Sequence, residues 1–426
     1  MSPLRQKSNL YVGATFLVML VALWVAQSAL EKKAAAQSNG AAQAPVFEVD
    51  PLWPKPLPNH WVLGSAIGVS VDDQEHVWII HRSSATLGNN EKPLELKTGE
   101  CCAGAPPVLE FDAAGNLLRH WGGPGQGYEW PDSNHGITID YKGNVWIGGN
   151  GASDSHLLKF TKDGKFLMQA GKKGARPGPP APARGRGAAT NDPDAIVAGG
   201  GQPTWLPNSN DPNNFGRVAK IFVDPKANEA YISDGYLNKR VAVIDADTGK
   251  IKRYWGAYGN KPDDTNLGPY NPDAPPAQQF RNPVHCAELA NDRMLYVCDR
   301  VNDRIQVFTT EGKFVKEGFI AKQTLNAGSA WDISFSRDPQ QRFIFLSDGV
   351  NEKVHILLRD TLQEVTNFGD GGRQPGQFYG VHSIATDSKG NIYTTETYEG
   401  KRVQKFVFKG LRSVKPTQGV VWPSSR

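Results

Sequence analysis

The chain of 426 residues carries a formal net charge of only +4 at pH 7 and has no dense basic block, which excludes a nucleic-acid partner of the usual basic kind. Its 39% hydrophobic content supports a large core, and its 45 glycines and 30 prolines favour a turn-rich, all-β fold.

The N-terminus has the pattern of an export signal. Arg5 and Lys7 precede an apolar run from Tyr11 to Ala26, an order typical of a secretory signal peptide. The run is short for a membrane span, and an uncleaved N-terminal anchor is the alternative, which would be the only contact with a membrane. In both cases the positive end stays inside, so the rest of the chain is exported to the periplasm or the extracellular space. We therefore expect a signal peptide or anchor in residues 1–29 and a flexible tether, rich in Ala, Gln and Ser, in residues 30–44.

A unit of short strands separated by turn residues recurs along the chain. It is clearest from Arg281 to Phe308, RNPVHCAELANDRMLYVCDRVNDRIQVF, where two strands flank an Asn-Asp turn and a third follows a polar loop. One unit of this size cannot bury its own faces, so further copies are needed. Six copies are present, beginning at Ala66, Asn134, Ala219, Arg281, Trp331 and Val381. Six repeats of three or four strands predict an all-β, six-bladed β-propeller with one blade per repeat.

The last repeat lacks a fourth strand after Phe408, which bears on how the ring closes. Other repeats end in a strand with an aromatic residue and a glycine, such as RHWGG at Arg119. We therefore predict that the segment from Val46 to Asp50 supplies the missing strand of the last blade and closes the ring. The propeller is then expected to span residues 45–412, followed by a C-terminal tail in residues 413–426.

A segment rich in Pro and Gly interrupts the repeats at residues 172–216. Its composition, GKKGARPGPPAPARGRG and onward, does not suit a pair of strands. We interpret it as an insertion between the second and third blades that is partly disordered. Because loops on one face of such a scaffold carry function, a lid over that face is the alternative.

The four cysteines are potential disulfides in an exported protein. Cys286 and Cys298 lie symmetrically about a predicted hairpin turn, so they should face each other closely enough to form a bridge. Two buried thiols are the alternative. Cys101 and Cys102 are adjacent in a long loop of the first repeat, where a vicinal disulfide, two free thiols and partners outside the chain are all open.

Alignment of the first strand of each repeat places histidines in alternate blades. The residues at this shared position are Ile67, His135, Ala219, His285, Trp331 and His382. In a six-bladed ring the second, fourth and sixth blades lie about 120° apart, so His135, His285 and His382 are predicted to converge on the axis. Three neutral imidazoles with one open position form the ligand set of a catalytic zinc ion or another divalent metal. The remaining histidines share no position and are interpreted as structural or surface residues: His60, His76, His81, His120, His156 and His355.

At these motifs the chain resembles a known family. The phrases NHGITID, PVHCAEL and GVHSIATD around the three histidines, and the loops DGYLNKR and CDRVNDRIQ, are similar to the catalytic core of peptidyl-α-hydroxyglycine α-amidating lyase, a six-bladed propeller of NHL-type repeats. The resemblance covers most of the chain between Phe47 and Phe408. It implies zinc bound by the three axial histidines, a catalytic tyrosine at Tyr236, and two active-site arginines at Arg82 and Arg300.

The chain departs from the family pattern beside the third axial histidine. The family has Met-Pro before that histidine, where this chain has Gly380-Val381, and an acidic residue after it that helps to hold a structural calcium, where this chain has Ser383. The resemblance therefore leaves a calcium ion without one of its ligands, and calcium is a doubtful cofactor here.

The residues suit the reaction that the resemblance implies, which is cleavage of a carbinolamide C–N bond to give an amide and glyoxylate. A metal ion stabilises the hydroxyl oxygen, and Tyr236 would accept its proton if the charge of the metal favours the phenolate. Arg82 and Arg300 suit a carboxylate because guanidinium binds it bidentately. The expected substrate is a small molecule or peptide with a carboxylate. Structural roles are the alternative, with Arg300 paired to Asp299 or Asp303 and Tyr236 packed on one face.

Two other functions fit parts of the pattern. A gluconolactonase-like hydrolase would hold its metal with Glu, Asp and Asn at the channel mouth, and no acidic residue occupies the shared axial position. A non-enzymatic NHL-repeat scaffold that presents one face to a protein or peptide accepts the repeats but leaves the alternating histidines unexplained. Metal analysis of the purified domain separates these classes.

Overall fold

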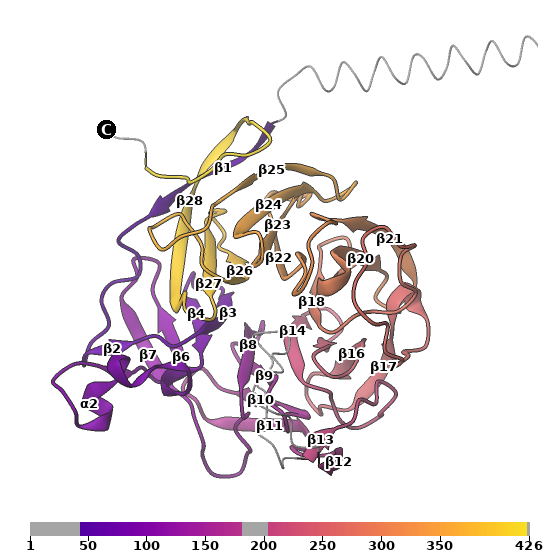
Figure 1. Cartoon of the computed structure of the whole chain (residues 1–426), viewed down its shortest axis with the longest axis horizontal. Helices are drawn as coiled ribbons and strands as arrows, with labels where there is room; N and C mark the ends of the chain where they lie inside the picture. The colour runs from indigo at the N-terminus through magenta and orange to yellow at the C-terminus, as the bar shows by residue number, and fades with distance from the viewer. Residues whose placement is uncertain (1–42, 181–202, 424–426) are drawn as a thin grey trace, which may run out of the picture.

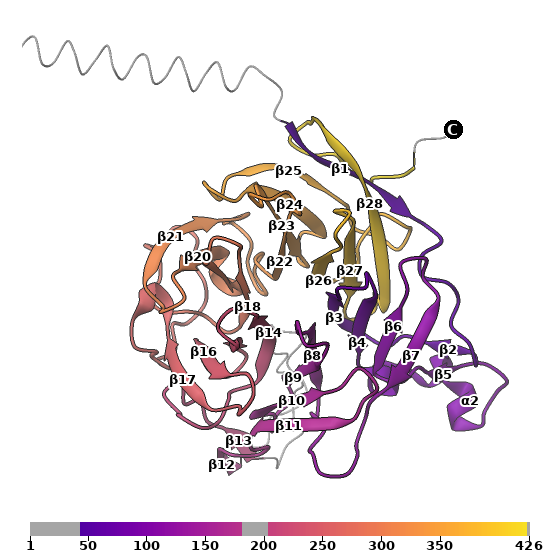
Figure 2. The same cartoon turned by 180° about the vertical axis from the view of Figure 1, so that it is seen from behind.

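The computed structural model describes residues 43–180 and 203–423 and confirms the six-bladed β-propeller. Six four-stranded antiparallel sheets surround a central axis, each with its first strand innermost (Figures 1 and 2). The first three blades are β3 (Ala66–Val71), β4 (Val77–His81), β6 (Val108–Phe111) and β7 (Leu117–Trp121); β8 (Asn134–Ile139), β9 (Val145–Gly149), β10 (His156–Phe160) and β11 (Phe166–Gly171); and β14 (Val218–Asp224), β15 (Glu229–Asp234), β16 (Arg240–Asp245) and β17 (Ile251–Trp255). The last three are β18 (Val284–Leu289), β19 (Leu295–Asp299), β20 (Arg304–Phe308) and β21 (Phe314–Phe319); β22 (Asp332–Phe335), β23 (Phe343–Asp348), β24 (Lys353–Leu358) and β25 (Glu364–Phe368); and β26 (Val381–Thr386), β27 (Ile392–Glu396), β28 (Arg402–Ser413) and β1 (Gln43–Asp50).

Buried apolar side chains fill the spaces between the blades. The middle strands β9 and β10 are buried along their whole length, whereas the outer strand β7 alternates between exposed and partly buried residues. Within the described part of the chain the core consists of six clusters, one between each pair of neighbouring blades. Because each blade is packed on both sides at the density of a protein interior, the inner strands hold fixed positions around the axis.

The N-terminal strand closes the ring as predicted. β1 pairs antiparallel with β28, so the last blade combines three C-terminal strands with one N-terminal strand. Phe47 on β1 is buried, and the centre of its ring lies 5.4 Å from those of Phe345 and Phe368 and 5.9 Å from that of Phe408. Since Phe345 and Phe368 belong to the fifth blade, β1 also joins the last blade to its neighbour.

Loss of β1 is expected to destabilise the ring. Deleting residues 1–52 removes this strand and exposes the edge of β28, whereas deleting residues 1–40 leaves every contact of β1 in place. Phe47→Ala alone should cost about 3–5 kcal/mol, because it truncates a buried aromatic ring. Glu48→Ala, which removes a partly exposed ion pair with Lys409, is the matched control and should cost at most about 1 kcal/mol. Thermal denaturation measures these effects, and equal melting temperatures for the two truncations would contradict closure by β1.

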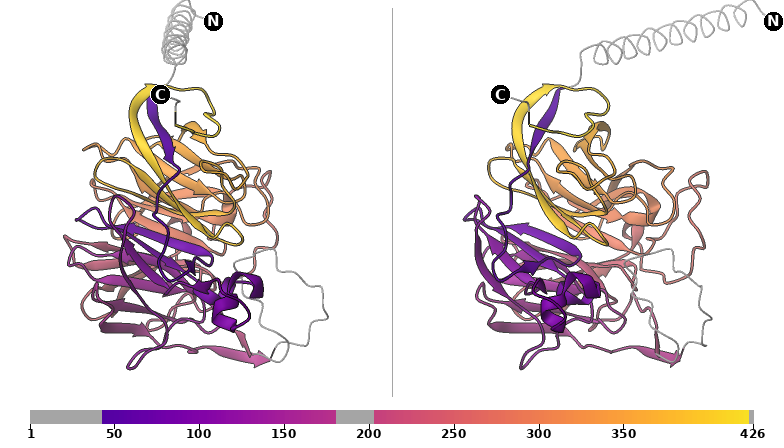
Figure 3. Two further views of the ribbon diagram at one scale, coloured as in Figure 1. Left: turned by 90° about the vertical axis from the view of Figure 1, so that its left-hand side faces the viewer. Right: turned by 60° about the vertical axis from the view of Figure 1, so that its left-hand side comes forward.

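The described parts of two insertions lie on the same side of the disc (Figure 3). The first follows Arg82 in the first blade, and the second separates the second and third blades. Their elements, with the short strand that pairs with the first insertion, are β2 (Trp61–Val62), η1 (Ser83–Thr86), η2 (Asn89–Glu91), α2 (Pro93–Leu96), β5 (Ala103–Gly104), β12 (Pro177–Pro180) and β13 (Pro203–Trp205). Two further 3-10 turns, η3 (Ala257–Gly259) and η4 (Arg300–Asn302), lie in loops of the third and fourth blades. The insertions therefore flank the face to which Arg82 belongs.

Both cysteine pairs are disulfide-bonded. Cys286 on β18 faces Cys298 on β19, with Cα atoms 4.8 Å apart, as the symmetry of the hairpin predicts. Cys101 and Cys102, for which three arrangements were open, form a vicinal disulfide in the loop before β5. Disulfides are typical of oxidising compartments, so the two pairs agree with an exported protein.

Several predicted segments lie outside the described residues. They are the signal peptide or anchor of residues 1–29, most of the tether of residues 30–44, the centre of the 172–216 insertion and the end of the 413–426 tail. Within residues 43–180 and 203–423, no helix has both the length and the apolar character needed to cross a membrane.

Candidate metal centre and active site

Three histidines meet on the propeller axis. His135, His285 and His382 come from β8, β18 and β26, the innermost strands of the second, fourth and sixth blades. Their ring centres lie 4.8–5.3 Å apart, and one nitrogen of each lies within 4.8 Å of the others. All three side chains are buried. The structure thus brings together the three residues that the alternate-blade pattern selects.

A β-bulge near the start of these strands directs the side chains to the axis. In the fourth and sixth blades the strand pairing skips His285 and His382 themselves, and in the second blade it skips Gly136, next to His135. A bulge breaks the regular alternation of a strand and re-aims the local side chain. The first strands of the first and third blades have the same irregularity, at Ile67 and Ala219, so this position of the repeat faces the axis in those blades as well.

Backbone carbonyls fix the orientation of two of the imidazoles. Nδ1–H of His135 donates to the Ala219 carbonyl at 2.7 Å, and Nδ1–H of His285 donates to the Trp331 carbonyl at 2.5 Å. Because a carbonyl only accepts, Nδ1 carries the proton and Nε2 presents its lone pair to the axis. Burial, followed by the neighbouring histidines and Arg300, lowers the pKa of His285 well below its usual value, so this ring is neutral. Neutral imidazoles with inward lone pairs fit a zinc ion or another divalent metal.

The hydroxyl of Tyr236 lies among these groups. It is 3.0 Å from Nε2 of His135 and 3.0 Å from Nε2 of His285. Arg300 donates from Nη1 to the same oxygen at 3.2 Å. The phenol oxygen therefore stands where two imidazole nitrogens and a guanidinium converge, a position suited to a group that exchanges a proton with a substrate.

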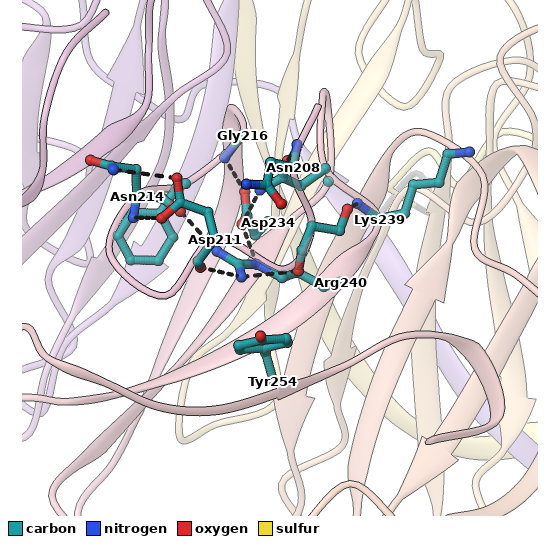
Figure 4. Close-up of polar contacts among 12 residues, drawn as sticks. Asn208, Asp211, Asn214, Gly216, Asp234, Lys239, Arg240 and Tyr254 are labelled. Carbon is teal, nitrogen blue, oxygen red and sulfur yellow. Dashed lines mark hydrogen bonds and ion pairs between the residues drawn. The ribbon is translucent and has the colours of Figure 1, made fainter. Parts of the chain in front are cut away.

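The loop that carries Tyr236 is braced at both ends. Asp234 ends β15 and Arg240 begins β16, and Arg240 Nε donates to Asp234 at 2.7 Å between two fully buried side chains. The guanidinium also donates to three backbone carbonyls of segment 209–214 and lies 4.8 Å above the ring of Tyr254 (Figure 4). This network ties the loop to the segment before the third blade, so several buried contacts hold the loop of Tyr236 in place.

Arg300 is fully buried beside Tyr236. It opens η4 directly after Asp299, and its guanidinium carbon lies 4.5 Å from the ring centre of Trp331. Asp299 pairs with Arg304 at 2.8 Å, as Asp234 pairs with its arginine one blade earlier. A guanidinium stacked on an aromatic face next to an axial site is well placed to bind a carboxylate.

Arg82 lies in the wall of a cavity of about 450 Å³ on the face of the disc that the insertions flank. The wall also includes Asn134, which precedes His135 in the chain, and Tyr398. Arg82 donates from Nη2 to Asn150 Oδ1 at 3.0 Å. The cavity therefore joins a guanidinium to the strand that carries the first axial histidine, and its volume is typical of a small-molecule pocket.

Two residues of the site had no predicted role. Tyr398 follows Glu396 by two positions, as Tyr236 follows Asp234, so comparing the loops TYEGKR and DGYLNKR shows that the two tyrosines are equivalent. Trp331 occupies the axial position of the fifth blade, where its carbonyl holds the second histidine and its ring stacks on the buried guanidinium. The repeat alignment lists Trp331 but gives no sign of either contact.

A second group of possible ligands, Asp72, His76 and Glu110, lies in the first blade. Lys162 donates to Asp72 at 2.9 Å, and Arg119 donates to Glu110 at 2.6 Å. Because cations already neutralise both carboxylates, this group is an ion-pair network and not a metal centre.

Comparison with known proteins agrees with the motifs. No protein-family model matches the chain. The chain is 25% identical over 258 residues to peptidyl-glycine alpha-amidating monooxygenase of Mus musculus and to its counterpart in Rattus norvegicus, covering 60% of this chain and 22% of each relative. The A form of Xenopus laevis is 28% identical over 184 residues, which are 43% of this chain and 15% of the relative. The chain therefore spans about a fifth of the length of these relatives, and this homology confirms the predicted resemblance.

Solved structures with a similar backbone arrangement include a streptogramin B lyase. It has 15% sequence identity and a TM-score of 0.47, and the match covers 86% of this chain and 98% of that one. A selenomethionine-substituted virginiamycin B lyase from Staphylococcus aureus has 14% identity and a TM-score of 0.43 over 88% and 94% of the two chains. At these values the similarity carries no argument about function.

Proposed function

We propose that this homologue of the peptidylglycine alpha-amidating monooxygenases is a metal-dependent carbon–nitrogen lyase that converts an N-acyl-α-hydroxyglycine into an amide and glyoxylate. The observation that carries the proposal is the meeting of the Tyr236 hydroxyl, the Arg300 guanidinium and three buried imidazoles on one axis. The homology to proteins named for amidation supports the same class of reaction.

The proposed reaction is an elimination. The substrate hydroxyl loses its proton, a carbon–oxygen double bond forms and the C–N bond breaks, while the amide nitrogen takes up a proton. Atoms and electrons balance without an oxidant, a reductant or water. Zinc, or another divalent ion held by His135, His285 and His382, would supply a Lewis acid that favours negative charge on the substrate hydroxyl oxygen. The chain must add a base, a binding group for the carboxylate and a buried site.

Tyr236 is the proposed base. The positive charge of Arg300, whose Nη1 is 3.2 Å away, stabilises negative charge on the phenol oxygen. The phenolate takes the proton of the substrate hydroxyl, and the phenol then returns it to the departing nitrogen, so one group serves both steps. Burial of the site keeps competing water from this exchange.

Arg82 and Arg300 are the proposed carboxylate-binding groups. Guanidinium binds a carboxylate in a bidentate manner, and the burial of both side chains strengthens the interaction. The cavity of about 450 Å³ beside Arg82 would hold the acyl part of the substrate. The substrate is thus a small molecule or peptide that carries a carboxylate, and we propose that it is met after export, since both cysteine pairs are oxidised.

Glyoxylate release tests the proposal. The zinc-loaded domain is expected to convert an N-acyl-α-hydroxyglycine into equal amounts of amide and glyoxylate, chelator-treated protein is expected to be inactive, and added zinc is expected to restore turnover. Chromatography measures the amide, and an enzyme-coupled assay measures the glyoxylate. Absence of glyoxylate with the fully zinc-loaded wild type would refute the lyase assignment.

Arg82→Ala serves as a control for substrate recognition in the same assay. The variant should raise KM about 10- to 100-fold with a smaller effect on kcat, because it removes a charged hydrogen-bonding group from substrate binding. Arg82→Lys keeps the positive charge but cannot bind a carboxylate bidentately, so its KM should lie between those of the wild type and Arg82→Ala. With a substrate whose carboxylate is replaced by a neutral amide, the KM values of the wild type and Arg82→Ala should differ little.

A further inference from the structure

On the axis next to the three histidines, a lysine ammonium lies between two carboxylates. Lys220 Nζ is 2.6 Å from Asp332 Oδ1 and 2.9 Å from Glu288 Oε1. The second Asp332 oxygen accepts from the Ser383 hydroxyl at 2.7 Å and from the Ile384 N–H at 3.1 Å. These side chains come from the third, fourth, fifth and sixth blades, so the cluster connects four of the six blades.

The cluster separates the candidate metal centre from the far face of the disc. A small cavity on the axis is lined by the three histidines together with Lys220, Asp332 and Ser383. A second cavity of about 260 Å³, lined by Lys220, Glu288 and the C-terminal halves of the inner strands, begins on the other side of the cluster. Ser383 directly follows the axial histidine His382 in the chain. Lys220 and Asp332 directly follow Ala219 and Trp331, whose carbonyls accept hydrogen bonds from the other two axial histidines.

The cluster supplies its own positive charge. Burial opposes the charge of Lys220, yet Asp332 and Glu288 raise its pKa above the usual value, so the ammonium stays protonated. Burial raises the pKa of Glu288 to about 7. The cluster therefore sets one positive charge against one or two negative charges and has no need of a further cation.

We infer that Lys220 is a built-in cation that takes the place of a second metal ion, so the chain requires only the divalent ion at the three histidines. The family resemblance implies a structural calcium held partly by an acidic residue after the third axial histidine. Here that residue is Ser383, and the nearby carboxylate, Asp332, is turned to Lys220. Calcium takes about 6–8 oxygen ligands at about 2.3–2.6 Å. The Lys220 ammonium occupies the position between the two carboxylates, so a calcium ion cannot bind there. The inference does not depend on which reaction the site catalyses.

Calcium binding to the wild type and to Lys220→Ala tests the inference. Terbium is the probe, because it occupies calcium sites and its emission is excited through a nearby tryptophan, here Trp331, the residue before Asp332. The zinc-loaded wild type is expected to show no calcium-displaceable terbium emission and no change in melting temperature at about 1 mM calcium. Lys220→Ala frees the space between two carboxylates. This variant is expected to gain calcium-displaceable emission and a rise of about 2–4 °C in melting temperature with calcium.

Two variants serve as matched controls. Lys220→Arg keeps the positive charge and should remain insensitive to calcium, whereas Lys220→Ala combined with Asp332→Asn should lose the response gained by the single variant. A calcium response of the wild type that Asp332→Asn removes would overturn the inference, and so would a folded Lys220→Ala without any calcium response. If Lys220→Ala does not fold, the wild type and Lys220→Arg decide. Absence of a calcium response in both proteins supports the built-in cation, and a calcium response in the wild type refutes it.

Discussion

Replacing His285 with alanine is expected to remove the bound metal and abolish glyoxylate release while the propeller stays folded. The residue offers one of the inward Nε2 lone pairs, and loss of a direct ligand should exceed the about 10- to 100-fold loss of metal affinity that follows removal of an outer partner. The apolar clusters that hold the blades together do not include the axial histidines, so the fold should persist. His135→Ala and His382→Ala should behave alike. Elemental analysis of dialysed protein, alongside circular dichroism, measures the effect.

His355→Ala is the matched control for these variants. His355 is also a buried histidine, but it lies between Asp348 at 3.1 Å and Glu364 at 3.0 Å in the fifth blade. The variant is expected to lose stability, because it breaks two ion pairs, and to keep its full metal content. Full zinc occupancy after each of the axial replacements, or no zinc in the wild type, would contradict the proposed metal centre.

The ring and its axial histidines could be predicted because the same local pattern occurs six times. Alignment of the units also aligns the side chains that face the axis, so His135, His285 and His382 were expected to meet, and their ring centres lie 4.8–5.3 Å apart. Closure by β1 was predictable for a related reason. The sixth unit lacks the fourth strand that the other units have, and the segment from Val46 to Asp50 lies outside the six units, so it can supply that strand.

The contacts between blades were not predictable in this way. The repeat alignment places Lys220 and Asp332 one residue after the axial position, but it does not show that their side chains lie 2.6 Å apart. That distance depends on the β-bulge of the strand that carries Lys220 and on how the third and fifth blades are placed around the closed ring. Glu288 lies further along its own strand and reaches the same ammonium from a third blade. An alignment of repeats describes each blade separately, whereas these ion pairs exist only in the closed ring.

Loop composition was a poor guide to the segment before the third blade. The Pro- and Gly-rich character of residues 172–216 predicts an insertion that does not form a pair of strands. This was wrong for its two ends, because β12 and β13 pair antiparallel, whereas most of segment 206–216 is irregular. Even so, three of its carbonyls accept hydrogen bonds from Arg240 and so help to hold the loop of Tyr236. Every residue type offers the same backbone carbonyl, so the amino-acid sequence of the segment carries no signal of this role.

Tyr236→Phe is expected to show how much one hydroxyl contributes to turnover. The change keeps the ring and its packing and removes only the oxygen that approaches two imidazoles and Arg300. If this oxygen carries the proton, kcat should fall about 10²- to 10⁴-fold. KM and zinc content should change little, because the carboxylate-binding arginines and the Nε2 ligands are untouched. Steady-state kinetics of the zinc-loaded proteins, with the metal content of each, measure the effect.

Tyr254→Phe is the matched control. Its ring lies under Arg240 in the network that braces the Tyr236 loop (Figure 4). Its hydroxyl donates to the Asn210 carbonyl at 3.1 Å. It should lower the melting temperature slightly and leave kcat within a few-fold of the wild type. If Tyr236→Phe also retains kcat within a few-fold, the base must be another group, although the metal centre would stand. If zinc is lost together with activity, the Tyr236 oxygen belongs to the coordination of the metal. A fall in kcat at full zinc occupancy is the one result that identifies Tyr236 as the proton carrier, because only then is the chemical step impaired while metal and substrate are still bound.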